Sequence, residues 1–124
     1  MVGVSQALKT AGSAARIVAL EPASSPFLST GVGGPHRVEG IGTGIVPPLL
    51  TPGTYDEVRA IEESEARTMA RRLAREEGVF GGVSTGLNVV AAVRLAEELG
   101  PGHIVATMAV DTGLKYLSGD LYDA

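Results

Sequence analysis

The feature that most constrains this chain is a glycine-rich turn that joins a short apolar run to an amphipathic helix. Residues 78–90 read Gly-Val-Phe-Gly-Gly-Val-Ser-Thr-Gly-Leu-Asn-Val-Val. The glycine pair ends the apolar run, and helical periodicity begins at the Ser84-Thr85-Gly86 triplet. This arrangement places a hydroxyl and several unpaired backbone N–H groups at a helix N-terminus, where polar or anionic ligand atoms bind. Serine and threonine also cap ordinary helices, so the turn alone leaves both roles open.

The composition favours one small globular domain. The chain has 124 residues, of which 44% are hydrophobic and 19% are charged, and this length suffices for a single core. Its 17 glycines and 7 prolines concentrate in residues 22–54, which predicts a long irregular connection there. Cysteine is absent, which excludes disulfides, thiolate metal sites and a thiol nucleophile.

Charge and hydropathy argue against nucleic-acid and membrane partners. The net charge is −4, and the arginines of residues 67–75 are flanked by glutamates at 62–65 and 76–77, as is typical of a solvated helix face with i,i+4 pairs. No apolar run reaches the roughly 18 residues of a membrane span, and no signal-peptide pattern is seen, so we expect a cytoplasmic protein. The two histidines lack acidic companions at ligand spacing, so no metal site is expected.

The hydrophobic periodicity predicts an α/β fold with a sheet that is at least partly parallel. The 103–110 segment is apolar enough for a buried strand, and Asp111 follows its carboxyl end. In chain order, we expect a helix at 3–11 (Val4, Ala7, Leu8 and Ala11 on one face), a strand at 16–20, a loop at 23–54, a strand at 55–61, helices at 64–77 and 85–99, and a strand at 103–110.

Two further blocks accompany the glycine-rich turn. Residues 33–48 read Gly-Gly-Pro-His-Arg-Val-Glu-Gly-Ile-Gly-Thr-Gly-Ile-Val-Pro-Pro, and residues 111–118 read Asp-Thr-Gly-Leu-Lys-Tyr-Leu-Ser. In this order and spacing, the three blocks resemble the C-terminal part of the cysteine synthase / cystathionine β-synthase family. These are fold-type II enzymes that use pyridoxal phosphate (PLP). The resemblance extends over essentially the whole chain.

The resemblance implies a three-layer αβα architecture. Its sheet would be the partial, doubly wound and mostly parallel sheet of the tryptophan synthase β-like enzymes, incomplete at the N-terminal side. Residues 1–124 would form one segment that corresponds to the C-terminal part of a PLP-dependent β-replacement enzyme. Residues 23–54 would be its Gly/Pro-rich active-site loop region.

The family motif implies that Ser84, Thr85 and Asp111 lie at the cofactor. Ser84 matches the hydroxyl that hydrogen-bonds the pyridine nitrogen of PLP. A neutral hydroxyl there leaves the ring nitrogen largely unprotonated, which suits β-elimination and β-replacement. Thr85 is also expected to cap the helix, and Asp111, near the ring-nitrogen end, to hold a loop. An N-cap role for Ser84 remains the alternative.

The same resemblance implies that Gly40, Ile41 and Gly42 contact the amino-acid substrate. A Cβ at such glycines would collide with a ligand that lies against the main chain. Alternatively, these glycines satisfy positive φ angles in a turn-rich loop. His36, in the same block, is expected to be structural and hydrogen-bonded to loop backbone.

The family's PLP-binding lysine and its phosphate-binding glycine loop belong to the N-terminal part, and neither motif is present here. The two lysines, Lys9 and Lys115, stand outside that lysine motif. We therefore expect part of a cysteine synthase that makes cysteine from an activated serine, inactive alone, with PLP bound in the complete enzyme. Its partners would be an amino-acid substrate and the missing N-terminal half or a homodimer partner. A non-catalytic interaction module, a cystathionine β-synthase-like fragment and an unstable remnant remain alternatives, and the donor and nucleophile stay open.

Overall fold

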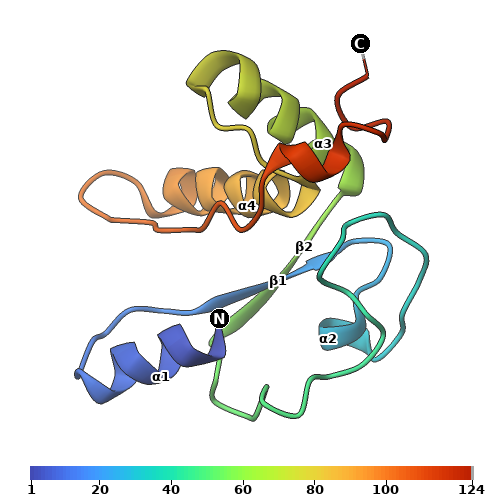
Figure 1. Ribbon diagram of the computed structural model, residues 1–124. Coiled ribbons are helices and arrows are strands. Elements are labelled where there is room, and N and C mark those ends of the chain that lie inside the picture. Colours follow the sequence, from blue (N-terminus) through green and yellow to red (C-terminus); the bar gives the residue numbers. More distant parts are fainter. Residues whose placement is uncertain (124) are drawn as a thin grey trace.

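The computed structural model describes residues 1–123 as a short parallel sheet with helices on both sides (Figure 1). Helices α3 and α4 lie on one side of the two strands, and α1 and α2 lie on the other (Figure 1). The α/β class expected from the sequence is confirmed. The elements are α1 (Val2–Thr10), β1 (Val18–Pro22), α2 (Phe27–Thr30), β2 (Glu57–Ile61), α3 (Glu63–Arg72) with a π-helical turn (Leu73–Glu77), α4 (Val83–Leu99) and a 3-10 turn (Gly113–Tyr116).

Strands β1 and β2 pair in parallel, from Val18 opposite Glu57 to Pro22 opposite Ile61. The expected strands at 16–20 and 55–61 are confirmed, although each begins two residues later than expected. Asp56 explains this start, because its carboxylate accepts the Ile17 N–H at 2.7 Å while its own N–H donates to the Ile17 carbonyl at 2.8 Å. The Asp56 side chain thus accepts from the Ile17 N–H, which is therefore not free to pair with backbone in a longer strand ladder.

The core lies where α3 crosses α4. Ala66 and Leu87 are fully buried at this crossing, and Ala70 is nearly so. A Cβ built on Gly86 of α4 would lie 2.0 Å from the Ala66 carbonyl oxygen, so only glycine allows the two backbones to approach this closely. The helices expected at 64–77 and 85–99 are confirmed, and Gly78 ends the first with a φ of 69°. The buried cluster comprises Val38, Ile61, Ala66, Ala70, Val83, Leu87, Val90, Ala91 and Leu121.

The strand expected at 103–110 is wrong for this structure. The segment runs without strand pairing, and nearly all of it is exposed, with Ile104 at 95%. A strand requires hydrogen bonds to a neighbour, and β1 and β2 are the only strands within residues 1–123. The apolar sequence is therefore present without the partner that would bury it.

Helix α1 confirms the helix expected at 3–11, but its apolar face is not buried. Val4 and Ala7 are exposed, whereas Ser5 is buried and its hydroxyl donates to the Thr54 carbonyl at 2.6 Å. Lys9 donates to the neighbouring Gly53 carbonyl. Helix α1 is thus attached through polar contacts to the loop that precedes β2.

The long connection at 23–54 is irregular, as expected, apart from the four residues of α2. Glu21, buried at the end of β1, accepts the backbone N–H groups of Leu28 at 2.7 Å and Ser29 at 3.2 Å. These are unpaired donors of the first turn of α2, so the carboxylate fixes the start of the loop. Among residues 1–123, no helix is long and apolar enough to cross a bilayer, and no cluster of potential metal ligands is found.

Gly86→Ala should lower the free energy of unfolding by about 2 to 3 kcal/mol, because the added methyl forces α3 and α4 apart. The matched control is Gly3→Ala in α1, where a Cβ meets nothing within 4 Å. The control should be neutral or more stable by up to about 1 kcal/mol, since alanine favours helix. Urea unfolding followed by circular dichroism measures both, and equal stabilities would contradict the close crossing.

Candidate functional site

Ser84 occupies the first turn of α4 and faces away from α3. Successive helical residues are rotated by about 100°, so Ser84 lies roughly 200° around the helix from Gly86, which contacts α3. Only 7% of its surface is exposed. Its hydroxyl makes no hydrogen bond within the described residues, and since none of their buried side-chain polar atoms lacks a partner, this hydroxyl reaches the surface. A hydroxyl that is open to a further partner therefore lies beside the unpaired N–H groups of a helix N-terminus.

Asp111 is the centre of the polar contacts around this turn. One carboxylate oxygen accepts the Gly82 N–H at 3.0 Å and the Thr85 hydroxyl at 3.3 Å. The other accepts the Tyr116 hydroxyl at 2.5 Å. Asp111 thus joins the glycine turn, the first turn of α4 and the C-terminal segment, and it places a negative charge where the helix dipole favours one.

The expectation that Thr85 caps the helix is wrong. The N-cap is Gly82, with extended backbone, and no side chain of the turn caps α4. Thr85 is the third helical residue, and its hydroxyl is directed to Asp111. The anion from the distant segment supplies what a local cap would otherwise provide. The N-cap alternative for Ser84 is wrong for the same reason.

Two tyrosines, Tyr116 and Tyr122, complete the contacts. Burial, together with the hydrogen bond to Asp111, raises the pKa of Tyr116 above its ordinary value. The Tyr122 hydroxyl donates to the Gly81 carbonyl at 2.5 Å, and its ring packs on Phe80 with centroids 4.6 Å apart. In the sequence, the short spacing between Asp111 and Tyr116 was the signal from which their hydrogen bond could have been predicted.

The backbone conformation of the glycine loop at 40–42 itself favours glycine at two of its positions. Gly40 and Gly42 have φ values of 83° and 62°, in the left-handed region that favours glycine. A Cβ on Gly42 would also lie 2.5 Å from His36 Nε2. These contacts support the turn-conformation explanation of the glycines, and the expected substrate contacts at Gly40, Ile41 and Gly42 stay a prediction.

His36 braces this loop, in agreement with the structural role expected for it. Its Nδ1 accepts the Val38 N–H at 3.2 Å, so the ring proton is on Nε2, which donates to the Gly42 carbonyl at 2.9 Å. Ser25 accepts the Gly34 N–H at 3.1 Å from the other side of the loop. The imidazole therefore fixes the path of the main chain through Gly42.

The structure brings some of the expected site residues together and leaves others separate. Thr85 is bonded to Asp111, and Ser84 adjoins them. Ile41 packs on the buried cluster that includes Val83, so the glycine loop and the start of α4 share one core. Within residues 1–123, no hydrogen bond joins residues 40–42 to Ser84, Thr85 or Asp111.

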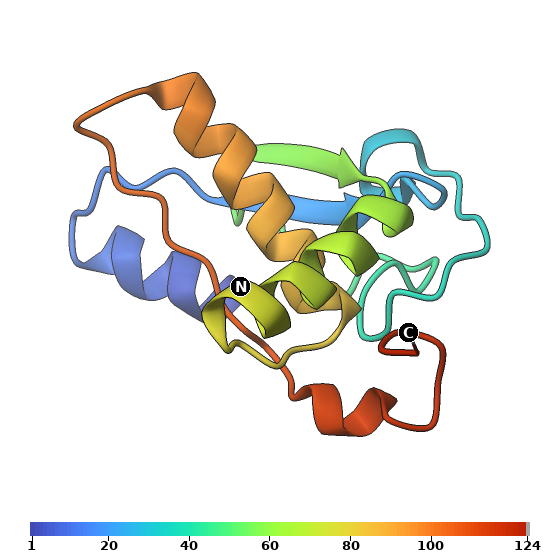
Figure 2. The same ribbon diagram turned by 90° about the horizontal axis from the view of Figure 1, so that it is seen from above.

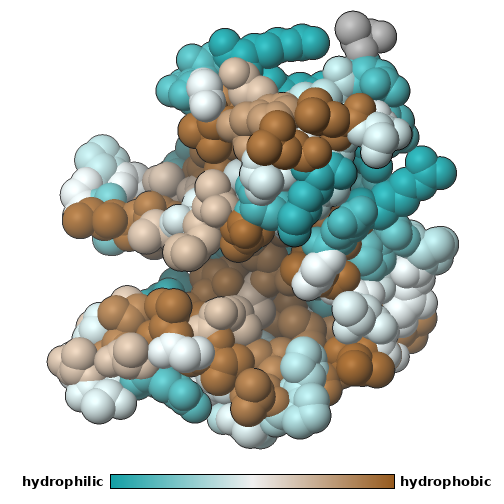
Figure 3. All heavy atoms as spheres, in the orientation of Figure 1, coloured by the Kyte–Doolittle hydropathy of each residue, from teal (hydrophilic) through white to brown (hydrophobic). Residues whose placement is uncertain are grey.

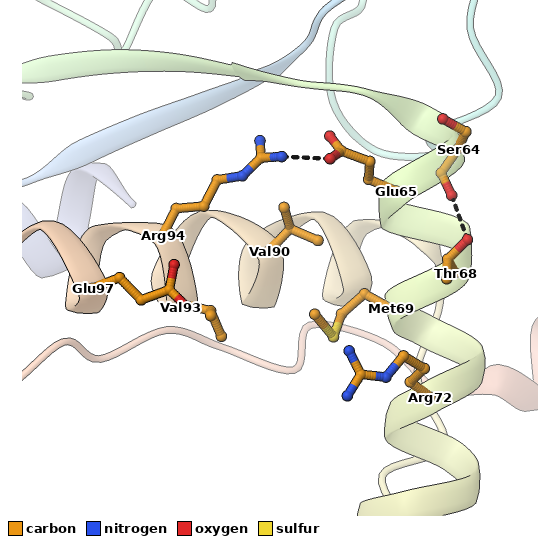
Figure 4. A pocket seen from close by; sticks show the side chains of 9 residues that line it. All are labelled: Ser64, Glu65, Thr68, Met69, Arg72, Val90, Val93, Arg94 and Glu97. Atoms are coloured by element: carbon orange, nitrogen blue, oxygen red, sulfur yellow. Dashed lines mark hydrogen bonds and ion pairs between the residues drawn. The ribbon is translucent and has the colours of Figure 1, made fainter.

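Among the hollows of the described residues, two are lined in part by α4. One, of about 450 Å³, lies between α3 and α4, with Met69, Val90 and Val93 in its lining and the Glu65–Arg94 ion pair at its edge (Figure 4). It contains none of the expected site residues. The other, of about 380 Å³, is lined in part by Val83, Lys115 and Tyr116, so it adjoins the start of α4.

The C-terminal residues are attached by surface charges as well. Asp120 accepts from Arg67 at 2.9 Å and from Arg37 at 3.3 Å, and the Arg67 guanidinium lowers the pKa of Asp120. Arg71 donates to the Leu121 carbonyl at 2.7 Å, and Leu121 itself is buried in the core. Arg37 and two arginines of α3 thus hold the C-terminal residues.

The sequence of this chain is similar to those of known enzymes. The family described as "Pyridoxal-phosphate dependent enzyme" matches residues 1–110. A cysteine synthase from Staphylococcus aureus (strain N315) is 42% identical over 120 residues, which cover 97% of this chain and 39% of that protein. A probable cysteine synthase from Bacillus subtilis (strain 168) is 41% identical over 122 residues, covering 98% and 39%. The chain therefore spans about two fifths of the length of these relatives.

Solved structures give the same result for the fold. The crystal structure of an O-ureido-L-serine synthase superposes with a TM-score of 0.92 at 39% identity, over 98% of this chain and 38% of that one. O-acetyl serine sulfhydrylase isoform 3 from Entamoeba histolytica gives a TM-score of 0.91 at 34% identity, over 98% and 36%. The chain thus has the backbone of one part of these larger enzymes.

Tyr116→Phe should lower the free energy of unfolding by about 1 to 2 kcal/mol, because Asp111 loses a donor to its charge. Chemical unfolding of the two single variants and the double variant with Asp111→Ala measures the coupling between these side chains. Purely additive effects would contradict the contact.

The raised pKa of Tyr116 also predicts a pH dependence. The unfolded chain ionises this tyrosine near pH 10, while the folded chain retains the proton to higher pH. The folded state then binds more protons, so stability should fall as the pH rises above about 10. Between roughly pH 8 and 11, the unfolding midpoint of Tyr116→Phe should fall less with rising pH than the midpoint of the unchanged chain.

Proposed function

The chain belongs to the family of pyridoxal-phosphate dependent enzymes, and we propose that it forms the part of a cysteine synthase that holds the ring end of the cofactor. The complete enzyme would act in the cytoplasm on an activated serine and replace its β-substituent with sulfur. The similar proteins named above support this substrate class, since two carry O-acetyl serine or O-ureido-L-serine in their names. The cofactor of the family is PLP.

The observation that carries the proposal is the Ser84 hydroxyl. It has no protein partner in residues 1–123, belongs to a residue of which only 7% is exposed and lies in the first turn of α4, so it fits a polar ring atom of a cofactor. When bound, PLP supplies an electron sink for the bonds at the substrate α-carbon. A neutral hydroxyl adds no proton to the ring nitrogen, and this favours replacement at the β-carbon.

Asp111 acts on this site through its neighbours. Three donors already occupy its two oxygens, so we assign it the positioning of the glycine turn and of Thr85. The carboxylate therefore keeps the first turn of α4 in place without itself meeting the ring nitrogen. Thr85 serves the same purpose, because its hydroxyl is directed to Asp111.

The loop at Gly40–Gly42 is assigned to the substrate side. Gly40 is exposed and a Cβ there would meet nothing within 4 Å, so its backbone is open to a ligand. His36 fixes the Gly42 carbonyl, which keeps the loop in one path. The loop would thus present main-chain groups to the amino acid in the complete enzyme.

The chain is proposed to be inactive alone. Lys9 lies on α1 and donates to the Gly53 carbonyl, and Lys115 lies in an exposed part of the 3-10 turn. Neither is placed at Ser84 by any contact in the described chain. The lysine that binds PLP would come from the remainder of the enzyme, in which a homodimer and an amino-acid substrate are the further partners.

A non-catalytic interaction module is the second candidate. It is favoured by the exposed apolar side chains of the C-terminal third, namely Ile104, Met108, Val110, Leu114 and Leu117. Such a module would bind an intact relative without binding PLP in its own site.

The test is reconstitution. The chain should restore PLP absorbance when mixed with the portion of the Bacillus subtilis relative that it does not match. Ser84→Ala should weaken PLP binding about tenfold, as expected for the loss of one hydrogen bond. Ser64→Ala is the matched control, because Ser64 is the second residue of α3 just as Ser84 is of α4. A soluble complex that binds no PLP would instead favour the interaction module.

A further inference from the structure

The peptide bond between Gly81 and Gly82 is bound at both of its polar groups by side chains of segment 111–122. The Gly81 carbonyl accepts the Tyr122 hydroxyl at 2.5 Å, and the Gly82 N–H donates to Asp111 at 3.0 Å. In a trans peptide these two groups point in opposite directions, so the two side chains approach the peptide plane from opposite edges. Figure 2 shows this segment, in red, passing beside the turn between α3 and α4. The orientation of this peptide plane is therefore fixed from two sides.

Gly81 and Gly82 are required by space rather than by a positive φ. A Cβ on Gly81 would lie 2.8 Å from the Thr85 side chain. A Cβ on Gly82 would collide with Asp111 and would lie 2.5 Å from the Tyr116 ring. Two adjacent glycines nevertheless give the peptide between them unusual freedom to rotate. The turn thus has room for its neighbours, but its backbone has little stiffness of its own.

This peptide directly precedes the helix that carries Ser84. Gly82 is the N-cap of α4, and its carbonyl accepts the Gly86 N–H at 3.2 Å, a bond of the first helical turn. No side chain of the turn caps this helix. If the peptide turned over, the Gly82 N–H would leave Asp111, and the direction in which the chain enters α4 would change. The orientation of Ser84, in the first turn, depends on that entry.

Tyr122 is held beside the turn independently of its hydroxyl. Its ring packs on the Phe80 ring with centroids 4.6 Å apart. The preceding residue, Leu121, is buried in the core, and its carbonyl accepts from Arg71 of α3 at 2.7 Å. Removal of the hydroxyl alone would therefore leave the aromatic ring in place.

The 3-10 turn of segment 111–122 is not held by burial of its leucines. Leu114 and Leu117 are 65% and 62% exposed, and Figure 3 shows hydrophobic residues at the surface over this turn. Its connection to the glycine turn is a backbone bond from the Gly113 N–H to the Phe80 carbonyl at 2.9 Å. Segment 111–122 thus acts on the glycine turn through hydrogen bonds to three successive residues, 80–82.

We propose that Tyr122 is a positioning residue for the cofactor site. Its hydroxyl, together with Asp111, holds the Gly81–Gly82 peptide in the one orientation that keeps the Ser84 hydroxyl available to the cofactor ring. The proposal rests on the proposed function, because it concerns the same Ser84 hydroxyl, and it adds a residue that has no hydrogen bond to Ser84. The alternative is that the Tyr122 hydroxyl only satisfies the Gly81 carbonyl and stabilises the fold.

Hydrogen exchange of the full chain, resolved by NMR, tests the hold on the peptide. Tyr122→Phe retains the ring and removes only the hydroxyl. In this variant the Gly82 amide should exchange about fivefold faster relative to the Val90 amide, which lies in the middle of α4 and reports the stability of the whole helix. Tyr55→Phe is the matched control, because Tyr55 is also half-buried and its hydroxyl makes no hydrogen bond within the described residues. The control should leave the ratio unchanged.

PLP binding tests whether Tyr122 acts through Ser84. The protein measured is the complex with the portion of the Bacillus subtilis relative that this chain does not match. Tyr122→Phe should weaken PLP binding about fivefold, whereas Tyr55→Phe should not change it. In a chain that already carries Ser84→Ala, Tyr122→Phe should have no further effect. A tyrosine that only stabilised the fold would change PLP binding equally with and without Ser84.

The outcomes separate this proposal from the proposed function. An unchanged ratio of Gly82 to Val90 exchange in Tyr122→Phe would overturn the proposal, whatever the complex binds. A raised ratio with unchanged PLP binding would also overturn it and would leave the role of Ser84 intact. PLP binding that Ser84→Ala does not weaken would contradict the proposed function, while a raised exchange ratio would still support the hold of Tyr122 on the Gly81–Gly82 peptide.

Discussion

The structure depends on the contact between α3 and α4 at Gly86. Because this residue has no side chain, the Ala66 carbonyl can lie against the α4 backbone, and the buried cluster forms around that crossing. The crossing also fixes the rotation of α4 about its axis. Ser84 is thereby directed away from α3, toward the side where no described residue bonds it. A packing requirement in the core thus decides which hydroxyl is available for chemistry.

The polar part of the site is organised by a single carboxylate. Asp111 accepts from the backbone of Gly82, from Thr85 and from Tyr116, which belong to three different stretches of the chain. These hydrogen bonds hold the Asp111 carboxylate near the N-terminus of α4. Ser84 is the uncharged hydroxyl group beside it. This division between a positioning anion and a neutral hydroxyl is the physical basis of the proposed ring-nitrogen site.

Local patterns in the sequence predicted most of the helices and strands but few of the pairings and contacts between them. The helices of residues 64–77 and 85–99 follow from periodicity and glycine stops, and both strands of the sheet were found within two residues. A strand was wrongly predicted for segment 103–110, because pairing is a property of two segments and apolar composition describes only one of them. Intrinsic pattern and tertiary context conflict there.

The site was predictable to the extent that it depends on motifs. Ser84 and Asp111 were proposed from theirs, and their place at the cofactor stays a prediction. The capping role of Thr85 was wrong, because a carboxylate 26 residues away takes its hydroxyl. Tyr122 could not be anticipated, since its bond to the Gly81 carbonyl joins residues 41 apart in the sequence. Contacts of this kind depend on how the C-terminal segment folds back, which no short motif encodes.

The attachment of the C-terminal residues combines two kinds of contact that respond oppositely to ionic strength. The Arg37–Asp120 pair has both side chains largely exposed, so dissolved ions screen it within a few ångströms at molar salt. Leu121 is buried, and its apolar contacts persist or strengthen under the same conditions. Near physiological salt, this end of the chain is held by charge and by burial together. In concentrated salt, the burial of Leu121 and the tyrosine contacts account for a larger share of this attachment, and the exposed Arg37–Asp120 pair for a smaller one.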